Sequence, residues 1–319
     1  MKTRRAEYVP IQVHALRTTG ANAVDLFVQY EAGSEPRLYC RAGNRPNEAQ
    51  FTELANAGIE NLYVRSGDFS VFSSALLESI DEVVQNPLIH SADKFAALQL
   101  AVAVTVEQTL RLLDCTKFRQ LAGRVADKLV DLFGQQDPLP RELFRLARHD
   151  SAAFTHVTNV ASYSIILARE IGISDVDDLR KIAVGALLHD VGKRFIPPAI
   201  LNKVDRVTPE EREAIEAHPT RGYAELCSSN ELDFGQLMMV YQHHERVDGT
   251  GYPVRVAQPE IHAWARLLSV VNAFDALTAR RPNRHPASPD SVLAYQRQHA
   301  GTRFDGDFVE CWISAMTKA

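Results

Sequence analysis

The spacing of apolar residues changes once along the chain, and this change limits the folds that it can adopt. The first 70 or so residues contain short β-type runs separated by Gly, Asn, Ser and Pro, a pattern typical of strands and turns. From about residue 72 onward, apolar residues recur at three- and four-residue steps and the strand pattern does not return, which predicts helices. We therefore expect a multi-domain α+β protein, with a small mixed α/β module followed by an all-α helical domain.

The elements expected in the first module are four strands and one helix. The strands are predicted at 8–13, 24–30, 37–40 and 61–65. The helix is predicted within 47–59, with Gly58 at its C-terminal end because glycine readily adopts the left-handed conformation required there.

The length of 319 residues suits two domains better than one. We predict an α/β regulatory module at 1–85, linker helices at 86–140 and the helical domain at 141–319. An apolar stripe in the predicted helix at 94–113 indicates a core face or, alternatively, a contact with a second subunit. A homodimer is therefore one of the expected assemblies.

Charge and composition exclude several classes of protein. A net charge of -5 argues against a general DNA- or RNA-binding protein, which needs a basic face. The longest apolar run, 96–106, is about half of the roughly 20 residues that a membrane span requires. No signal-type apolar segment follows the basic N-terminus. The four scattered cysteines indicate neither a disulfide framework nor a thiolate zinc site. We expect a cytoplasmic protein without a membrane partner.

Five histidines of the second block stand in helices or at helix ends, and one of them precedes an aspartate. The residues are His156, His189 with Asp190, His218, His243 and His244. Asp190 follows an apolar run, and a buried unpaired carboxylate would cost several kcal/mol. A positive group must therefore meet it, and a metal ion is the simplest candidate. Each histidine taken singly fits a core or surface residue, whereas the set together favours a metal site.

The ligand chemistry and the spacing set limits on such a site. Imidazole and carboxylate ligands without thiolate suit iron, manganese or zinc. Adjacent helical residues project about 100° apart, so His243 and His244 are not expected to bind one ion in the same way. Lys193 is predicted one turn beyond His189, close to the same helix face. Arg280, Arg281 and Arg284 form a basic cluster that is either solvated surface or, beside a metal centre, a phosphodiester site.

These residues together resemble a known family. "HD" with "GK" after it (189–193), then "HHERVDGTGYP" (243–253), "FDAL" (274–277) and "RP" (281–282) are similar to the motifs of the HD-GYP domain, a branch of the HD phosphohydrolase superfamily. The resemblance covers roughly 150–310. It implies an all-helical HD-type domain with two or three iron or manganese ions, which hydrolyses the bacterial second messenger cyclic di-GMP to pGpG or GMP.

The resemblance also assigns roles to single residues. It implies that Asp190 bridges the ions, and it matches a third-ion ligand to His244 and the signature tyrosine of the substrate pocket to Tyr252. The other implied metal ligands are His156, His189, His218 and His243. The positions implied to contact phosphate are Lys193, Arg281 and Arg284, and Asp190 and Lys193 are the expected catalytic pair.

Three positions depart from the family pattern. A metal-binding aspartate is usual three residues before the aspartate of "FDAL", but this chain has Asn272 there, while Asp275 keeps its carboxylate. A neutral amide oxygen is a weaker ligand, so one ion is expected to bind less tightly. Ala152 stands where members with three ions carry a glutamate, so we expect two ions and no third. Asn283 replaces the tyrosine of an "RPY" motif.

Three functions follow as hypotheses. The first is a binuclear cyclic di-GMP phosphodiesterase. The second is a catalytically degenerate domain that binds a nucleotide or a partner protein without turnover, because Asn272 replaces a ligand. The third is hydrolysis of another nucleotide or phosphoester by the same chemistry. Signalling protein partners are expected, and the signal sensed by the N-terminal module is left open.

Overall fold

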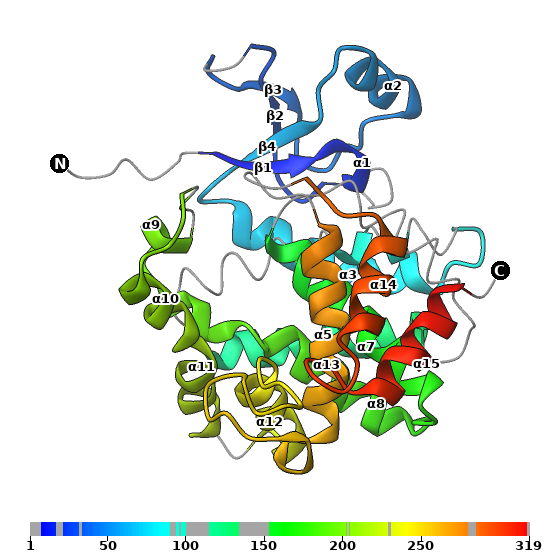
Figure 1. Ribbon diagram of the computed structural model, residues 1–319. Coiled ribbons are helices and arrows are strands. Elements are labelled where there is room, and N and C mark those ends of the chain that lie inside the picture. The colour runs from blue at the N-terminus through cyan, green and yellow to red at the C-terminus, as the bar shows by residue number, and fades with distance from the viewer. Residues whose placement is uncertain are drawn as a thin grey trace. The chain divides into compact units, whose positions relative to one another are not determined.

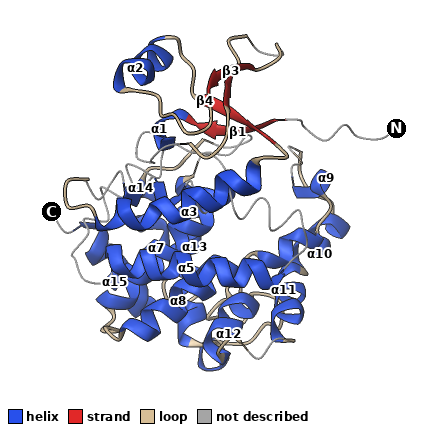
Figure 2. Cartoon of the chain, turned by 180° about the vertical axis from the view of Figure 1, so that it is seen from behind, coloured by secondary structure: helices blue, strands red, loops and turns tan. Residues whose placement is uncertain are grey.

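The computed structural model describes residues 8–16, 22–31, 34–89, 94–95, 97–99, 115–133, 153–201, 203, 205–228, 231–279 and 285–317. The chain divides into two compact units, residues 1–108 and 109–319. This division falls inside the segment predicted as linker helices, whose boundaries stay a prediction. Most of the predicted helix at 94–113 lies outside the described residues. Among those described, the four strands all belong to the first unit and the second is helical (Figures 1 and 2).

The first unit is a small antiparallel sheet with helices, and its predicted strands and helix are confirmed. The strands are β1 (Tyr8–Gln12), β2 (Leu26–Val28), β3 (Arg37–Cys40) and β4 (Asn61–Arg65), in the order β1-β4-β2-β3. The helices are α1 (Val13–Leu16), α2 (Glu48–Asn56) and α3 (Phe69–Gln85). In β4, Leu62 and Val64 are fully buried while their neighbours are not, which is the alternation of a sheet with one covered face.

The ends of α2 follow from its sequence. Asn47 accepts a hydrogen bond from the Gln50 N–H, and the Gln50 side chain accepts one from the Asn47 N–H. This capping box satisfies two backbone donors at the helix start. Gly58 has φ +68°, the left-handed conformation predicted for the end of this helix.

In the part that the structure describes, the second unit is built of helices. Its elements are α5 (Cys115–Phe133), α7 (Ala153–Glu170), α8 (Val176–Leu188), η1 (Val191–Phe195), α9 (Pro198–Leu201), α10 (Pro209–Glu216), α11 (His218–Cys227), α12 (Phe234–Gln242), η2 (Gln258–Glu260), α13 (Ala263–Thr278), α14 (Pro289–Gln298) and α15 (Gly306–Thr317). The predicted capping box of α10, with Thr208 and Glu211, is confirmed. No described helix is long and apolar enough to cross a lipid bilayer.

Helix α7 lies at the centre of this unit. Every residue from 157 to 168 is buried, and α7 packs against α5, α8, α13 and α15 (Figure 1). A helix that is buried on all sides belongs to the interior of a bundle. The first turn of α7, which carries His156, is thereby held beside α8 and α13.

Because of the N-terminal cap of α13, we expect the free energy of unfolding of the protein to depend on pH. Nδ1 of His262 accepts a hydrogen bond of 3.1 Å from the Trp264 N–H, so this nitrogen must be unprotonated. Burial, and then the charge of Arg266, lower the pKa of His262. A lowered folded-state pKa gives stability that is present above the unfolded value of about 6.5 and is lost as the pH falls below it.

We expect this cap to be worth about 1 kcal/mol. Denaturant unfolding at pH 7.5 and pH 5 checks it, with His262→Asn as the reference because asparagine caps helices without titrating in this range. The free energy of unfolding of the natural chain should fall relative to that of the variant on acidification. An equal fall in both proteins would contradict the assignment.

Candidate metal centre

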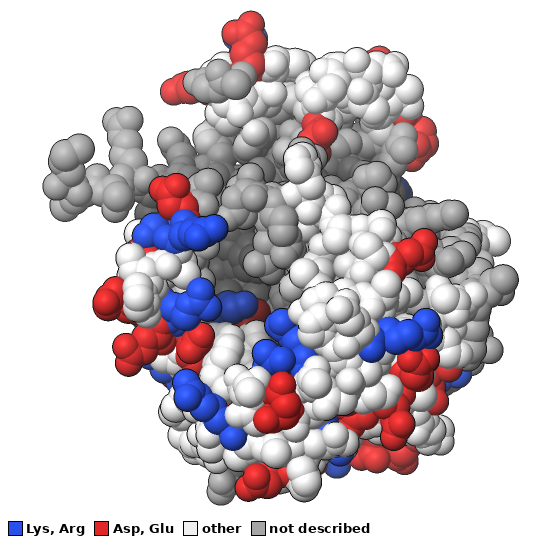
Figure 3. All heavy atoms as spheres, in the orientation of Figure 1, with Lys and Arg blue, Asp and Glu red and all other residues white. Residues whose placement is uncertain are grey.

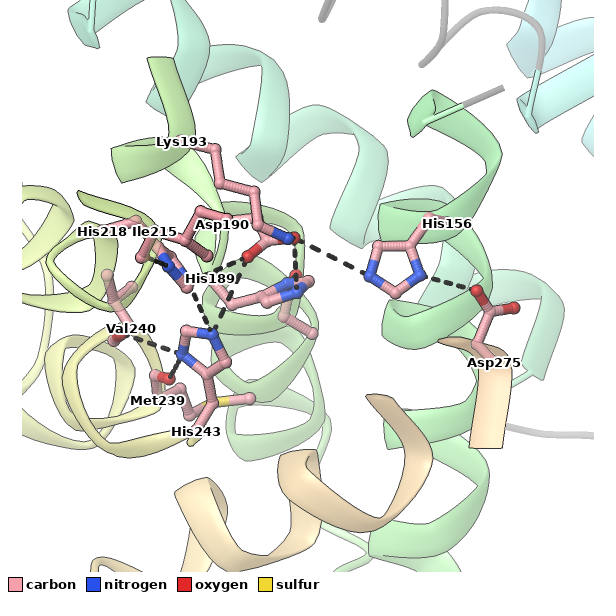
Figure 4. Close-up of polar contacts among 11 residues, drawn as sticks. His156, His189, Asp190, Lys193, Ile215, His218, Met239, Val240, His243 and Asp275 are labelled. Atoms are coloured by element: carbon pink, nitrogen blue, oxygen red, sulfur yellow. Dashed lines mark hydrogen bonds and ion pairs between the residues drawn. The ribbon is translucent and has the colours of Figure 1, made fainter. Parts of the chain in front are cut away.

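The histidines predicted as ligands come from the ends of different helices, and the fold brings them to one place (Figure 4). His156 lies in the first turn of α7, His189 follows the last residue of α8, and His218 begins α11. His243 follows α12, and His244 comes next. The chain turns at His189 and Asp190 before η1 begins.

Asp190 stands at the centre of this group. Its Oδ2 lies 3.3 Å from Nε2 of His189 and 3.8 Å from Nε2 of His156. Its Oδ1 lies 3.3 Å from Nε2 of His218 and 3.8 Å from Nε2 of His243. Each carboxylate oxygen therefore faces two imidazole nitrogens.

The other ring nitrogen of each of these histidines is held by an acceptor. Nδ1 of His189 donates to the carbonyl of Ala186 (2.6 Å), and Nδ1 of His218 donates to that of Ile215 (2.7 Å). Nδ1 of His243 donates to the carbonyl of Val240 (3.0 Å). Nδ1 of His156 donates to Oδ2 of Asp275 (2.6 Å). With Nδ1 protonated, a neutral imidazole presents the lone pair of Nε2. All four lone pairs then point toward Asp190, which is the orientation that metal-binding histidines adopt.

The pKa shifts of His243, His244 and Asp190 favour two neutral imidazoles beside an ionised carboxylate. Burial lowers the pKa of His243 and that of His244 well below the ordinary value. Burial alone would raise the pKa of Asp190, but the positive charge of Lys193 beside it acts in the opposite direction, and this pKa is held well below its ordinary value. At neutral pH the site therefore keeps the negative charge of Asp190 beside the neutral imidazoles of His243 and His244.

Lys193 meets the charge of Asp190 directly. Its Nζ donates to Oδ2 of Asp190 at 2.5 Å, and its side chain is 38% exposed. The positive group required by a buried carboxylate is thus present in the chain itself, so burial of Asp190 does not by itself demand a metal ion. The prediction that Lys193 shares a helix face with His189 is wrong, because α8 ends at Leu188 and Lys193 lies on η1.

Buried polar atoms without a hydrogen-bond partner are a stronger sign of a cation site than the burial of Asp190. Nε2 of His189 and Oδ1 of Asp190 are buried and have no hydrogen-bond partner among the described residues. Leaving a buried polar atom without a partner costs about 1–3 kcal/mol. In addition, Nε2 of His218 and Nε2 of His243 lie 3.2 Å apart, where two lone pairs repel each other. A cation would satisfy all four atoms, so this cluster fits a divalent metal.

Two overlapping groups of ligand atoms could hold such ions. One group is His156, His189 and Asp190, and the other is Asp190, His218, His243 and His244, with the ligand atoms within 4.8 Å of one another in each. The rings of His243 and His244 have centroids 4.1 Å apart, and both residues lie in the turn that follows the end of α12 at Gln242.

The helix α13 contributes one residue that contacts the first group, and it also carries Asn272. Asp275 is the acceptor for His156, and its other oxygen accepts from Nδ2 of Asn159 at 2.9 Å. Asn272 is buried one turn earlier on the same helix. Sequence reasoning noted that Asp275 keeps a carboxylate but missed its contact with a ligand, and the role of Asn272 as a ligand stays a prediction.

Gly192 allows the close packing that places His218. A Cβ atom at this position would lie 1.9 Å from the carbonyl oxygen of His218 and 2.7 Å from the backbone nitrogen of Gly222. No side chain fits between these backbones, so glycine is required where η1 crosses the start of α11. The glycine of the "GK" pair is thus a structural residue of the site, a role that sequence reasoning missed.

The loop after His244 is held by a buried acid. Glu245 is 3% exposed, and its carboxylate accepts from the N–H groups of Val254 (2.6 Å) and Arg255 (3.0 Å). This clamp folds the loop back so that the ring of Tyr252 stacks on that of His244, with centroids 4.6 Å apart and an interplanar angle of 24°. Tyr252 therefore covers the side of the cluster formed by His244.

Five positions named in the sequence analysis lie outside the described residues. They are Ala152, Arg280, Arg281, Asn283 and Arg284. Of the positions predicted to contact phosphate, Lys193 is described and reaches Asp190. On the face shown in Figure 3, Lys and Arg side chains are interspersed with acidic ones.

Comparison with known proteins gives a match to the HD domain family over residues 141–308. The chain is 32% identical over 202 residues to the cyclic di-GMP phosphodiesterase response regulator RpfG of Xanthomonas campestris pv. campestris, covering 61% of this chain and 53% of the relative. It is 36% identical over 174 residues to a cyclic di-GMP phosphodiesterase of Pseudomonas aeruginosa (54% and 42%). It is 29% identical over 271 residues to a 3'3'-cGAMP-specific phosphodiesterase of Vibrio cholerae (85% and 54%).

The chain thus spans about half the length of these curated relatives. Among solved structures, an HDG"Y"P protein from Bdellovibrio bacteriovorus superposes with a TM-score of 0.74 at 19% identity. The similarity covers 98% of this chain and 100% of that one. At this identity the match concerns the fold, and it includes both the sheet-containing and the helical parts.

Proposed function

The chain belongs to the HD domain family, and from this membership we propose that its helical unit hydrolyses cyclic di-GMP to pGpG or GMP. The proposed cofactors are two divalent ions, iron or manganese. The observation that carries the proposal is the arrangement around Asp190, whose two oxygens each face two histidine Nε2 atoms. A carboxylate that is shared in this way is suited to bridge two ions.

The names of the relatives support a cyclic dinucleotide as the class of substrate in this proposal. Those of Xanthomonas campestris and Pseudomonas aeruginosa are cyclic di-GMP phosphodiesterases, and that of Vibrio cholerae is specific for 3'3'-cGAMP. All three act on cyclic dinucleotides. Because the chain spans about half of each, the choice of cyclic di-GMP is part of the proposal. Signalling partners and a homodimer stay predictions.

Two groups of residues would hold the ions. One contains His156, His189 and Asp190, and the other contains Asp190, His218, His243 and His244, with Asn272 as a predicted neutral ligand. When bound, such ions supply Lewis-acid polarisation of a phosphoryl group and activation of water.

The side chains around the cluster have separate tasks in this proposal. Asp190 stays ionised because its pKa is held low. Lys193, partly exposed and already beside Asp190, provides a positive charge for a phosphate oxygen. Burial raises the pKa of Tyr252, so its phenol stays protonated and able to donate a hydrogen bond to the substrate. Arg281 and Arg284 are proposed as further phosphate contacts.

The direct test uses the purified protein loaded with iron or with manganese. It is incubated with cyclic di-GMP, and the nucleotides are separated by chromatography. We expect pGpG or GMP to accumulate with the natural chain and not with a His189→Ala, Asp190→Ala double variant. Equal amounts of product from both proteins under both metals would overturn the proposal. Parallel reactions with 3'3'-cGAMP test the hypothesis that the substrate is a different nucleotide.

Asn272 motivates the second candidate, a domain that binds the nucleotide without turnover. A carboxylate at this position is a stronger ligand for a hard cation than an amide. If the natural chain is an enzyme, we expect Asn272→Asp to change the rate of hydrolysis by less than about tenfold, or about 1.4 kcal/mol, while metal is held more tightly. A variant that hydrolyses cyclic di-GMP when the natural chain does not would identify the natural chain as a receptor.

A further inference from the structure

His156 differs from the other histidines of the cluster in the acceptor that holds its Nδ1. His189, His218 and His243 each donate to the backbone carbonyl three residues earlier. His156 instead donates to a carboxylate oxygen of Asp275, which is 119 residues away in the chain and only 4% exposed.

The position of each histidine in its helix explains this difference. His189 and His243 directly follow the last residue of α8 and of α12, and His218 follows α10 by one residue as it begins α11. The carbonyls of a last helical turn lack the regular helix partner and can accept from a side chain. His156 lies in the first turn of α7, where the nearby carbonyls accept the regular hydrogen bonds of the helix. Its Nδ1 must therefore find an acceptor in another part of the fold.

We propose that Asp275, held by Asn159, is the positioning residue that prepares His156 to bind metal. Asp275 accepts through both oxygens: Oδ2 from His156 Nδ1 at 2.6 Å and Oδ1 from Asn159 Nδ2 at 2.9 Å. This pair of contacts fixes the direction of the carboxylate. His156 is then confined to the tautomer with hydrogen on Nδ1, and its Nε2 lone pair points toward Oδ2 of Asp190, 3.8 Å away.

The acceptor also affects the strength of His156 as a ligand. A carboxylate carries a full negative charge, whereas the carbonyls that hold the other histidines are neutral. A charged acceptor on Nδ1 makes the opposite nitrogen a better ligand for a cation. We infer that His156 is the ligand whose metal affinity depends most on its supporting residue.

The Asp275→Asn variant tests this inference, because it keeps the shape and removes the charge. An amide at this position can offer its oxygen to His156 or to Asn159, but its NH2 group must then face the other, which is also a donor. One of the two contacts is lost, and the Nδ1–H tautomer of His156 is no longer enforced.

The measurement is Mn2+ binding to the full, chelator-treated protein by titration calorimetry. We expect the dissociation constant of the Asp275→Asn variant to rise about 10- to 100-fold, while the far-ultraviolet circular dichroism spectrum of the metal-free variant stays like that of the natural chain. The matched control is Tyr163→Phe, which removes a buried hydroxyl from the same helix α7, and its affinity should stay within about twofold. An unchanged affinity in the Asp275→Asn variant would overturn the inference.

A second measurement uses the natural protein, so it does not depend on whether a variant folds. In the natural protein without metal, nitrogen-15 spectra of the histidine rings report which nitrogen carries the proton. We expect the proton of His156 on Nδ1, although free imidazole side chains prefer the other tautomer. A proton on Nε2 would overturn the inference.

The inference rests on the proposed metal-dependent function, but different results would contradict the inference and the proposed reaction. A natural chain that binds Mn2+ and loses this affinity in the Asp275→Asn variant, yet hydrolyses no cyclic di-GMP, supports the role of Asp275 and contradicts the proposed reaction. A natural chain that hydrolyses cyclic di-GMP, while its Asp275→Asn variant binds Mn2+ as tightly, supports the reaction and contradicts the role of Asp275.

Discussion

The Asp190→Asn variant is expected to hydrolyse cyclic di-GMP at least about 1000-fold more slowly than the natural chain, a loss of about 4 kcal/mol of transition-state stabilisation. The replaced carboxylate lies between His189 on one side and His218 on the other, at 3.3 Å from each. An amide of the same shape has one oxygen, so its NH2 group must face one of these unprotonated nitrogens and donate to it. A nitrogen that accepts this hydrogen bond no longer offers its lone pair to a cation.

Metal content and turnover are both measured for this variant. Each should fall, and the far-ultraviolet circular dichroism spectrum should stay helical. The matched control is Asp127→Asn, the same chemical change in an exposed ion pair with Arg180, in which the side chains are 44% and 50% exposed. An exposed pair contributes at most about 1 kcal/mol, so this control should keep its metal and its activity. Equal losses in both variants would indicate a general effect on the fold.

The Gly192→Ala variant is expected to lose about 3 kcal/mol of unfolding free energy and to bind metal more weakly. The added methyl group would overlap the backbone of His218 and Gly222, and overpacking a rigid interior typically costs 1–3 kcal/mol. Because the backbone atoms cannot move aside as a flexible side chain would, α11 must shift. His218 lies at the start of this helix, so the shift also displaces a ligand.

A matched control is available in α5. At Gly123 an added Cβ would meet no atom of the described residues within 4 Å, and alanine in an accessible helical position is favoured over glycine by about 0.5–1 kcal/mol. Urea unfolding should therefore show Gly123→Ala neutral or stabilised, and Gly192→Ala destabilised. Calorimetry with Mn2+ should show weaker binding for Gly192→Ala alone. If Gly192→Ala were as stable as the natural chain, the backbone approach of η1 and α11 would be less tight than described.

Features that depend on neighbouring residues could be predicted from the sequence. The Thr208 and Glu211 capping box is an example, because its partners are three residues apart and their hydrogen bonds form locally. The strands of the first unit were predicted for a similar reason, since alternation and turn residues are local signals. The histidines predicted as ligands were grouped from the sequence because the "HD" and "HHERVDGTGYP" motifs are intact, and the structure brings them together.

Features that depend on distant residues could not be predicted in the same way. No local pattern links Asp275 to His156, and their contact exists only because α7 and α13 pack together. The requirement for Gly192 arises from the crossing of η1 and α11. The contact of Lys193 with Asp190 was missed for another reason: helical periodicity was extended past Leu188, where α8 ends. Each of these errors concerns tertiary packing or a helix boundary.

The ligand atoms of the cluster belong to segments that lie far apart between His156 and His244. A cation held by them would close long loops of the chain, as a crosslink does, and would bind the folded form in preference to the unfolded form. At a free ion concentration 100 times the dissociation constant, this preference adds about 2.7 kcal/mol to the unfolding free energy. The thermal stability of the helical unit is then set by the metal content of the solution as well as by its amino-acid sequence.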